Sequence, residues 1–254
     1  MRSLRESLTC VGLVIGLSVA SLASPALAQT LDPAPAESPA LSRLFKTTLA
    51  DFRRLPSNET LRWLVMGGSA SSAGHILDWD ISNSFSGTHR VDGFFRPGRT
   101  IGGARAQIAG AITTYVVGRI GRQPRIARLG SDLVRAQLVT QTLTAGIKLS
   151  ARRTRPDGGE YSFPSGHSSV TFATAPVVQR HFGWKGGIPA YALASYVAAS
   201  RVQTRRHFTS DVAFGAAIGI VAGRTVTVGR GNARFTASPD VSPQKAGVSF
   251  TLVN

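Results

Sequence analysis

The feature that most constrains the fold is a repeated helical pattern, because apolar residues recur at helical spacing in segment after segment between residues 59 and 226. Most of these segments are apolar over nearly their whole circumference, which is typical of helices buried in a helical core or in a membrane. None contains about eighteen uninterrupted apolar residues, the length that a membrane-spanning helix usually needs. The pattern therefore predicts a soluble, all-α helical bundle. The predicted helices cover 59–77, 104–121, 131–150, 168–183, 188–200 and 209–226.

The remaining segments have a different character. Residues 78–103 are rich in turn-forming residues and are predicted to form a long connection. Near the C-terminus, Val248, Phe250 and Leu252 alternate with polar residues, which predicts a short β-hairpin. We therefore expect four parts: a signal peptide (1–28), a flexible mature N-terminus (29–58), a helical domain (59–229) and a C-terminal tail or β-hairpin (230–254).

The first 28 residues have the composition of a secretory signal peptide. Arg2 and Arg5 precede a short apolar core, and Ala-Leu-Ala at 26–28 fits a signal-peptidase site, so we expect export with cleavage near Ala28. A membrane anchor is the alternative. The single cysteine, Cys10, lies in this segment, so the exported protein would contain no disulfide and would depend on an ordinary core for its stability.

The chain is strongly basic, with a net charge of +16. The predicted signal peptide contributes Arg2, Arg5 and Glu6, one net positive charge, so the mature protein would carry +15. Such a charge attracts anions, whether phosphate groups, anionic lipid surfaces or nucleic acid. Charge alone does not choose among these partners.

One histidine lies in an unexpected place. His207 follows two arginines and precedes Asp211 by four residues, at the start of the predicted helix 209–226. At this spacing the carboxylate can reach back to one imidazole nitrogen, fix the tautomer and leave the other nitrogen available. Such a histidine is suited to act as a nucleophile or a base. The alternative is an ordinary pair at a helix start.

Two other segments predict an anion site. In Pro-Ser-Gly-His at 164–167, Ser165 and Gly166 lie at a predicted helix N-terminus, where backbone N–H groups attract anions. Lys148, Arg155 and Arg201 add one point charge and two planar guanidinium groups, a set that suits the non-bridging oxygens of a phosphoryl group. Taken singly, each of these residues could equally be a solvated surface residue.

Carboxylates are scarce in this part of the chain. Between residues 148 and 211 they are Asp157, Glu160 and Asp211. This set does not form the oxygen-ligand cluster that Mg²⁺ or Zn²⁺ requires, so the sequence predicts neither a metal site nor a cofactor. Cationic side chains would take the place of the metal.

Together the three segments form a recognisable signature. They fit K-x6-R-P, P-S-G-H and S-R-x5-H-x3-D at every fixed position, in the right order and with suitable intervening lengths. The chain thus resembles the type 2 phosphatidic acid phosphatase / vanadium haloperoxidase superfamily, which also contains bacterial class A acid phosphatases. The resemblance is specific over 148–211 and looser over the helices from 104 to 226. It implies a helical bundle of the superfamily type.

The resemblance also implies a role for each residue of the signature. His207 would attack phosphorus and form a phosphohistidine, and Asp211 would hold its ring. His167 would protonate the leaving oxygen and then activate water. The phosphoryl oxygens would be bound by Lys148, Arg155, Ser165, Gly166 and Arg201.

Other basic residues lie at variable positions of the signature. For Arg152, Arg153, Arg205 and Arg206, the sequence leaves open whether they are solvated loop charges or draw in anionic substrates. Histidines outside the signature (His75, His89 and His181) are expected to be structural or surface residues.

These observations predict an exported, metal-independent phosphatase that hydrolyses phosphomonoesters. Its substrate would be a soluble ester or a lipid phosphate or diphosphate, and the basic charge would favour association with an anionic membrane surface. Absence of long apolar spans favours soluble esters modestly, and no nucleic-acid partner is expected. The alternatives are vanadate-dependent halide oxidation and a non-enzymatic anion-binding protein.

Overall fold

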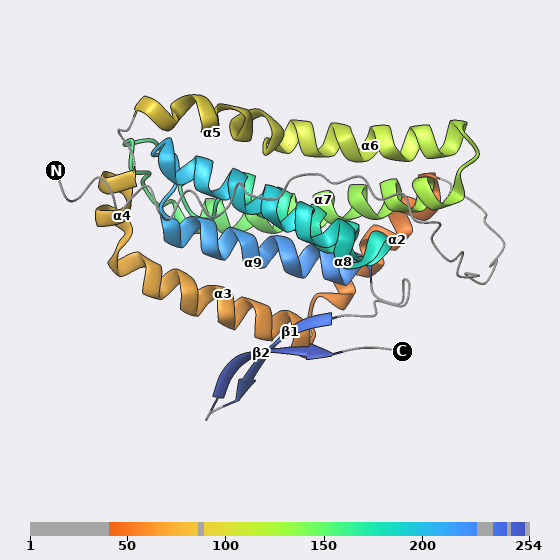
Figure 1. The fold of residues 1–254 in the computed structure, drawn as a ribbon. Coiled ribbons are helices and arrows are strands. Elements are labelled where there is room, and N and C mark those ends of the chain that lie inside the picture. The colour runs from red at the N-terminus through yellow and green to blue at the C-terminus, as the bar shows by residue number, and fades with distance from the viewer. Residues whose placement is uncertain (1–40, 86–88, 228–235, 243–244, 252–254) are drawn as a thin grey trace. The chain divides into compact units, whose positions relative to one another are not determined.

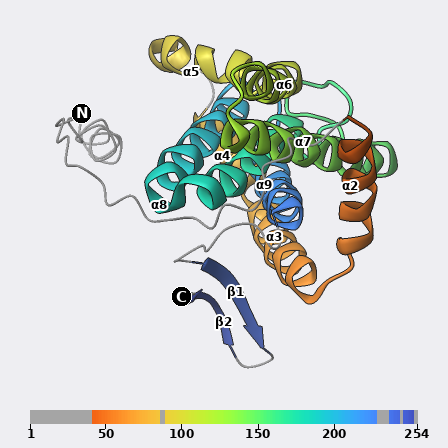
Figure 2. The same cartoon turned by 90° about the vertical axis from the view of Figure 1, so that its right-hand side faces the viewer.

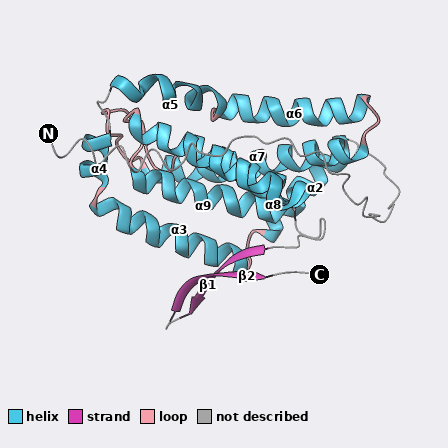
Figure 3. Cartoon of the chain, viewed as in Figure 1, coloured by secondary structure: helices cyan, strands magenta, loops and turns pink. Residues whose placement is uncertain are grey.

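The computed structural model describes residues 41–85, 89–227, 236–242 and 245–251. In this part of the chain, helices alternate with short connections and one antiparallel hairpin follows the last helix (Figures 1 and 3). The elements are α2 (Leu41–Arg54), α3 (Asn58–Ile76), α4 (Asp78–Phe85), α5 (His89–Ile101), α6 (Ala104–Ile120), α7 (Pro124–Ala151), α8 (Gly166–Gln203), α9 (Thr209–Val226), β1 (Thr236–Ser242) and β2 (Lys245–Thr251). The predicted all-α fold is confirmed. The predicted signal peptide lies outside the described residues.

The longest helix, α8, consists of two limbs that reverse at Gly183. This glycine has φ +67° and ψ −161°, a conformation that other residues rarely adopt. Across the reversal the rings of Phe172 and Tyr191 lie 6.3 Å apart, so the second limb runs back along the first. The two helices predicted at 168–183 and 188–200 correspond to these limbs. The reversal returns Arg201 to the end of the bundle at which α8 begins.

Helix α9 packs closely on the first limb of α8 because glycines recur on the contact face. A Cβ atom on Gly219 would lie 2.2 Å from the carbonyl oxygen of Ser169, closer than atoms can approach. Equivalent close approaches pair Gly215 with Ser165 and Gly223 with Ala173. Since both partners advance by four residues, the two helices run parallel and begin at the same end of the bundle. Both helices also pack beside α7 (Figure 2).

One predicted helix boundary and one predicted connection are wrong. The predicted helix 131–150 begins earlier, at Pro124, because a proline suits the first turn of a helix. The segment 78–103, predicted to be a long connection, forms α4 and α5. Helix α5 contains Pro97 and is held by aromatic packing instead of by local propensity: the rings of Phe95 and Tyr196 stack at 5.7 Å.

Helix α2 also corrects an expectation, because it occupies part of the segment 29–58 that was predicted to be flexible. Leu44, Phe52 and Leu55 recur at helical spacing and pack against the core formed by α6, α7, α8 and α9. The helix carries one fully buried carboxylate, Asp51. Within residues 41–85 and 89–227, every helix falls short of the length or apolar content that a membrane span requires.

The buried Asp51 belongs to an ionic cluster that joins four helices. Arg135 of α7 donates to both oxygens of Asp51, over 2.7 and 2.6 Å, and to Asp132 over 2.9 Å. It also donates to the carbonyl oxygen of Val226 in α9 over 3.1 Å. His181 of α8 contacts Asp132 over 2.9 Å, which gives this histidine the structural role expected for it.

We expect Arg135→Met to destabilise the fold by about 3–5 kcal/mol, because it leaves two buried carboxylates without their cation. The measurement is urea unfolding followed by circular dichroism. The matched control is Arg54→Met, because Arg54 is 53% exposed and lies 3.6 Å from the same Asp51. Its expected effect is within about 0.5 kcal/mol. Equal effects of the two substitutions would show that the buried cluster does not stabilise the fold.

Candidate active site

The predicted site residues meet at the end of the bundle where α8 and α9 begin. Lys148 comes from the last turn of α7, and Arg201 from the end of α8. Ser165 is the N-cap of α8, and its backbone N–H donates to the carbonyl oxygen of Asp211 over 2.9 Å. Parallel packing of α8 and α9 is what brings these two helix N-termini together. The structure thus assembles the residues predicted from the signature, and their chemical roles stay predictions.

His207 is almost fully buried, and its tautomer follows from its neighbours. Its Nδ1 lies 2.7 Å from the carbonyl oxygen of Ser162, which can only accept a hydrogen bond, so Nδ1 carries the proton. Nε2 is then unprotonated in the neutral ring. Burial, helped by the charges of Lys148 and Arg201, lowers the pKa of His207 to about 4, so the ring is neutral at neutral pH. A neutral imidazole with a bare Nε2 is a competent nucleophile.

Asp211 holds His207 less directly than its spacing predicts. Its Oδ2 lies 3.8 Å from Nδ1 of His207, which is too far for a hydrogen bond. Instead, Oδ2 accepts hydrogen bonds from the hydroxyl of Ser162 and from the backbone N–H of Phe208. The carboxylate therefore fixes Ser162, whose carbonyl group in turn orients the imidazole. Sequence reasoning missed Ser162, because its contact with His207 uses a backbone atom that no side-chain motif reveals.

His167 lies in the first turn of α8. Its Nε2 lies 3.2 Å from the carbonyl oxygen of Arg99, so Nε2 carries a proton. Burial, together with the charge of Arg201, lowers the pKa of His167 to about 4. The charges that lower this pKa are cations, so a bound dianion would counteract them and raise it.

Within the described residues, the cations around the two histidines form no ion pair with a carboxylate, although the charges of Asp157 and Asp211 act on Arg201 and Lys148. Nζ of Lys148 donates to the carbonyl oxygen of Tyr161 over 2.5 Å, and burial, helped by Arg155, lowers the pKa of Lys148 to about 8. Burial, helped by Arg206 and other arginines, lowers the pKa of Arg201 to about 10. The Nε atoms of Arg155 and Arg201 are buried without a hydrogen-bond partner among the described residues. Buried donors without partners are costly, so this arrangement indicates a place for an anion.

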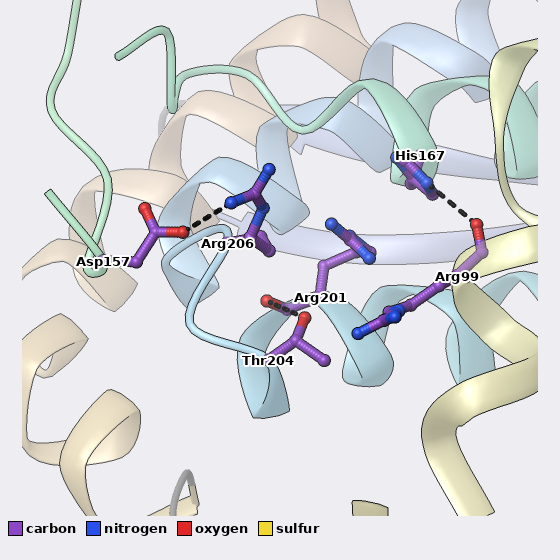
Figure 4. Close-up of a pocket in the computed structure, with 6 residues that line it drawn as sticks. All are labelled: Arg99, Asp157, His167, Arg201, Thr204 and Arg206. Atoms are coloured by element: carbon purple, nitrogen blue, oxygen red, sulfur yellow. Dashed lines mark hydrogen bonds and ion pairs between the residues drawn. The ribbon is translucent and has the colours of Figure 1, made fainter. Parts of the chain in front are cut away.

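A pocket of about 510 Å³ opens beside His167 and Arg201, the two predicted site residues that line it (Figure 4). Arg206 donates to Asp157 across 2.8 Å at its rim, whereas Arg99 points toward Arg201 from α5. Sequence reasoning missed Arg99, because this residue lies in the segment predicted to be a connection. It also gave Asp157 no role in the site. The pocket is lined by Arg99, Asp157, His167, Arg201, Thr204 and Arg206.

The basic residues whose role the sequence does not decide lie in different environments. Arg206 lines the pocket, whereas Arg152 bonds the carbonyl oxygen of Leu149 at the exposed end of α7. Arg153 is partly buried and bonds Asp211. In the part of the chain that the structure describes, no three His, Cys, Asp or Glu side chains gather where a metal ion could be held.

Comparison with known families agrees with the signature. Residues 138–235 match the model of the PAP2 superfamily, the type 2 phosphatidic acid phosphatases. This stretch is therefore similar to the PAP2 superfamily. It contains the C-terminal half of α7, all of α8 and α9, and every residue of the predicted signature.

Two curated relatives align with part of this chain. The lipid A 1-phosphatase of Porphyromonas gingivalis is 38% identical over 99 residues, which is 37% of this chain and 22% of that protein. The lipid A 4'-phosphatase of Helicobacter pylori is 31% identical over 114 residues, which is 40% of this chain and 58% of that protein. The alignments thus cover less than two thirds of either relative.

Two solved structures share the fold. A transmembrane PAP2-type phosphatidylglycerolphosphate phosphatase from Bacillus subtilis superposes with a TM-score of 0.53 and 21% identity, over 74% of this chain and 94% of that chain. LpxE from Aquifex aeolicus superposes with a TM-score of 0.51 and 20% identity, over 60% of this chain and 95% of that chain. At these identities the likeness concerns the fold alone.

The lowered pKa of Lys148 leads to a pH-dependent affinity for anions. Only the ammonium form attracts an anion, so the contribution of Lys148 to sulfate affinity should be constant well below pH 8, and affinity should fall about tenfold per pH unit above it, until the pKa of the complex is reached. Lys148→Arg should abolish this fall, because arginine stays charged. Calorimetric titration with sulfate at several pH values checks the prediction. An unchanged fall in the variant would assign it to another group.

Proposed function

We propose that the chain is a phosphatase that cleaves phosphomonoesters through a phosphohistidine on His207, without a metal ion. One observation supports this most strongly: the Nε atoms of Arg155 and Arg201 are buried without a partner among the described residues, near a neutral histidine whose Nε2 carries no proton. A pocket built in this way binds a phosphate group and offers it a nucleophile. Both curated relatives are phosphatases by name, which agrees with the proposal.

The first step transfers the phosphoryl group to the enzyme. Nε2 of His207 forms a bond to phosphorus while the bond from phosphorus to the leaving oxygen breaks, and the departing oxygen takes a proton from His167. Lys148, Arg155 and Arg201 neutralise the charge on the phosphoryl oxygens, together with the N-terminus of α8. The charge of the substrate favours the protonated form of His167 that this step requires.

The second step releases phosphate. His167, now neutral, accepts a proton from water while the water oxygen attacks phosphorus and the bond to Nε2 breaks. His207 returns to its starting tautomer, because Nδ1 remains bonded to the carbonyl oxygen of Ser162 throughout. Each group is thereby ready for another cycle.

For the substrate class, we propose a lipid phosphate. The sequence alone favours soluble esters modestly, but both curated relatives are named as lipid A phosphatases. We further propose that the protein is exported, with cleavage near Ala28, as the composition of residues 1–28 favours. The basic charge of the mature protein, +15, would support binding to anionic membrane surfaces.

The proposal is tested with purified protein and a substrate panel measured with and without chelator. The panel contains lipid A and phosphatidic acid in vesicles, together with glycerol phosphate and nitrophenyl phosphate. Release of phosphate should survive excess chelator and be fastest from the lipids, and vanadate should inhibit competitively.

Three outcomes would overturn the proposal or part of it. Loss of activity on chelation with recovery by Mg²⁺ or Zn²⁺ would refute the metal-free mechanism. Halide oxidation dependent on vanadate, without phosphate release, would assign the haloperoxidase reaction instead. Binding of phosphate without turnover of any ester would identify a non-enzymatic anion-binding protein.

A further inference from the structure

Arg153 lies between two buried carboxylates, Asp78 and Asp211, that are far apart in the sequence. One terminal nitrogen, Nη1, donates to Asp211 Oδ1 and to the hydroxyl of Ser210, each over 2.7 Å. The other, Nη2, donates to Oδ2 of Asp78 over 2.8 Å and lies 3.0 Å from Nδ1 of His75. Asp78 and Asp211 are almost fully buried, whereas the side chain of Arg153 is 23% exposed. The guanidinium group thus joins the junction of α3 and α4 to the start of α9.

Asp78 anchors this arrangement from its own side. Its Oδ1 accepts the backbone N–H of Ser210 over 3.0 Å, and its Oδ2 accepts the hydroxyl of Ser210 over 2.5 Å. The carboxylate therefore bonds both the first turn of α9 and Arg153. This double contact fixes the guanidinium group relative to the helix that carries Asp211.

The backbone of Arg153 also contacts Ser162, the residue whose carbonyl group orients His207. Its carbonyl oxygen accepts the N–H of Ser162 over 2.7 Å, and Ser162 in turn bonds His207 and Asp211. Its guanidinium group lies 4.4 Å from the centre of the Phe208 ring, beside the same histidine. Arg153 is therefore bonded to the two groups nearest Nδ1 of His207, through its backbone carbonyl to Ser162 and through its side chain to Asp211.

The positive charge of Arg153 affects the ionisation of Asp211. Burial opposes ionisation of Asp211, but the neighbouring His207, the hydrogen bonds from Ser162 and Phe208, and the charge of Arg153 hold its pKa below the usual range. Without Arg153, the carboxylates of Asp78 and Asp211 would lose the cation between them. Removing one partner from a buried ionic group leaves an uncompensated charge and disturbs its neighbours.

We infer that Arg153, anchored by Asp78, is a positioning residue that fixes Ser162 and Asp211 and thereby orients the imidazole of His207. This role rests on the proposed phosphatase function, because it serves the attack of Nε2 on phosphorus. Arg153 does not touch the phosphoryl group. The sequence alone does not assign a role to Arg153, since it lies at a variable position of K-x6-R-P.

The test compares Arg153→Gln and Arg153→Lys with Arg152→Gln, the neighbouring exposed arginine, in the full protein. For Arg153→Gln we expect kcat to fall about 10–100-fold, the range typical of residues that orient a reacting group, with KM within about threefold. The acid limb of the kcat profile should move to higher pH, since Asp211 loses a cation that favours its ionised form. Arg153→Lys should restore part of kcat, and Arg152→Gln should behave like the wild type.

Two further measurements separate positioning from other roles. Sulfate affinity should be unchanged in Arg153→Gln, and the nitrogen NMR shifts of His207 should report a mixture of tautomers in place of the single one with Nδ1–H. Asp78→Asn should produce the same changes, and the double substitution should add little, because both act through one network.

The outcomes are distinguishable. Weakened sulfate binding would make Arg153 a phosphate ligand, and an unchanged kcat with an unchanged tautomer would show that it is only structural; either result overturns the inference. A wild-type protein without phosphatase activity would refute the proposed function, whereas the NMR measurement would still decide the orientation of His207. If Arg153→Gln fails to fold, Arg153→Lys and Asp78→Asn carry the same comparison.

Discussion

His207→Ala is expected to abolish turnover and, with it, the acid-labile phosphoenzyme. The loss should be about 10⁴-fold or more, the size seen when a nucleophile is removed from a site whose other groups stay in place. The structure offers the reason: Nε2 of this ring is held unprotonated by the bond from Nδ1 to Ser162, near the cations Lys148 and Arg201. Rapid-quench trapping of labelled phosphate on the protein measures both quantities.

The control for this substitution is His181→Gln, because His181 pairs with Asp132 in the ionic cluster and lies outside the pocket. Its turnover per folded molecule should match the wild type. Sulfate binding to His207→Ala should persist, since Lys148, Arg155 and Arg201 remain. Phosphoenzyme formed by His207→Ala at the wild-type rate would assign the nucleophile to another residue.

His167→Ala should slow hydrolysis by about 10²–10⁴-fold for substrates with a poor leaving group, because general acid catalysis contributes about that much. Glycerol phosphate is such a substrate, since its alkoxide needs a proton as it departs. Nitrophenyl phosphate releases a stable anion, so its phosphorylation step should suffer far less. Its phosphoenzyme should nevertheless accumulate, because the variant lacks the base that activates water in the second step.

The measurement compares the two esters by rapid quench in the wild type and in His167→Ala. The two steps are separated by following release of the alcohol or phenol and release of phosphate independently. Equal losses in the phosphorylation step for both esters, with no accumulated phosphohistidine, would contradict the role assigned to His167. An effect confined to KM would instead make this residue a phosphate ligand.

The sequence predicts the catalytic core well, because its chemistry depends on side chains in a fixed local order. Pro-Ser-Gly-His starts a helix, and the spacing between His207 and Asp211 places both near the first turn of another. Helix α9 begins at the predicted Thr209 and ends at the predicted Val226. Periodicity and turn chemistry were sufficient here, since both are local properties of the chain.

What the sequence missed depends on long-range contacts. Ser162 acts through its carbonyl group, and Arg153 acts through Asp78, which lies 75 residues away. Neither relation has a periodic signal. Likewise, the glycines and Pro97 of α5 indicated turns. A helix forms there because aromatic side chains of α5 pack on Tyr196, in the second limb of α8. Tertiary packing overrode local propensity.

The reversal of α8 at Gly183 has a consequence for the order of folding. His167 and Arg201 lie on the two limbs of a single helical hairpin, so closing that hairpin brings a histidine and a cation of the pocket together with a small loss of chain entropy. Contacts of low sequence separation form early, whereas Arg99 can join the pocket only once α5 has docked. An anion bound between the limbs would therefore stabilise a unit smaller than the whole domain. We expect sulfate to accelerate refolding as well as to oppose unfolding.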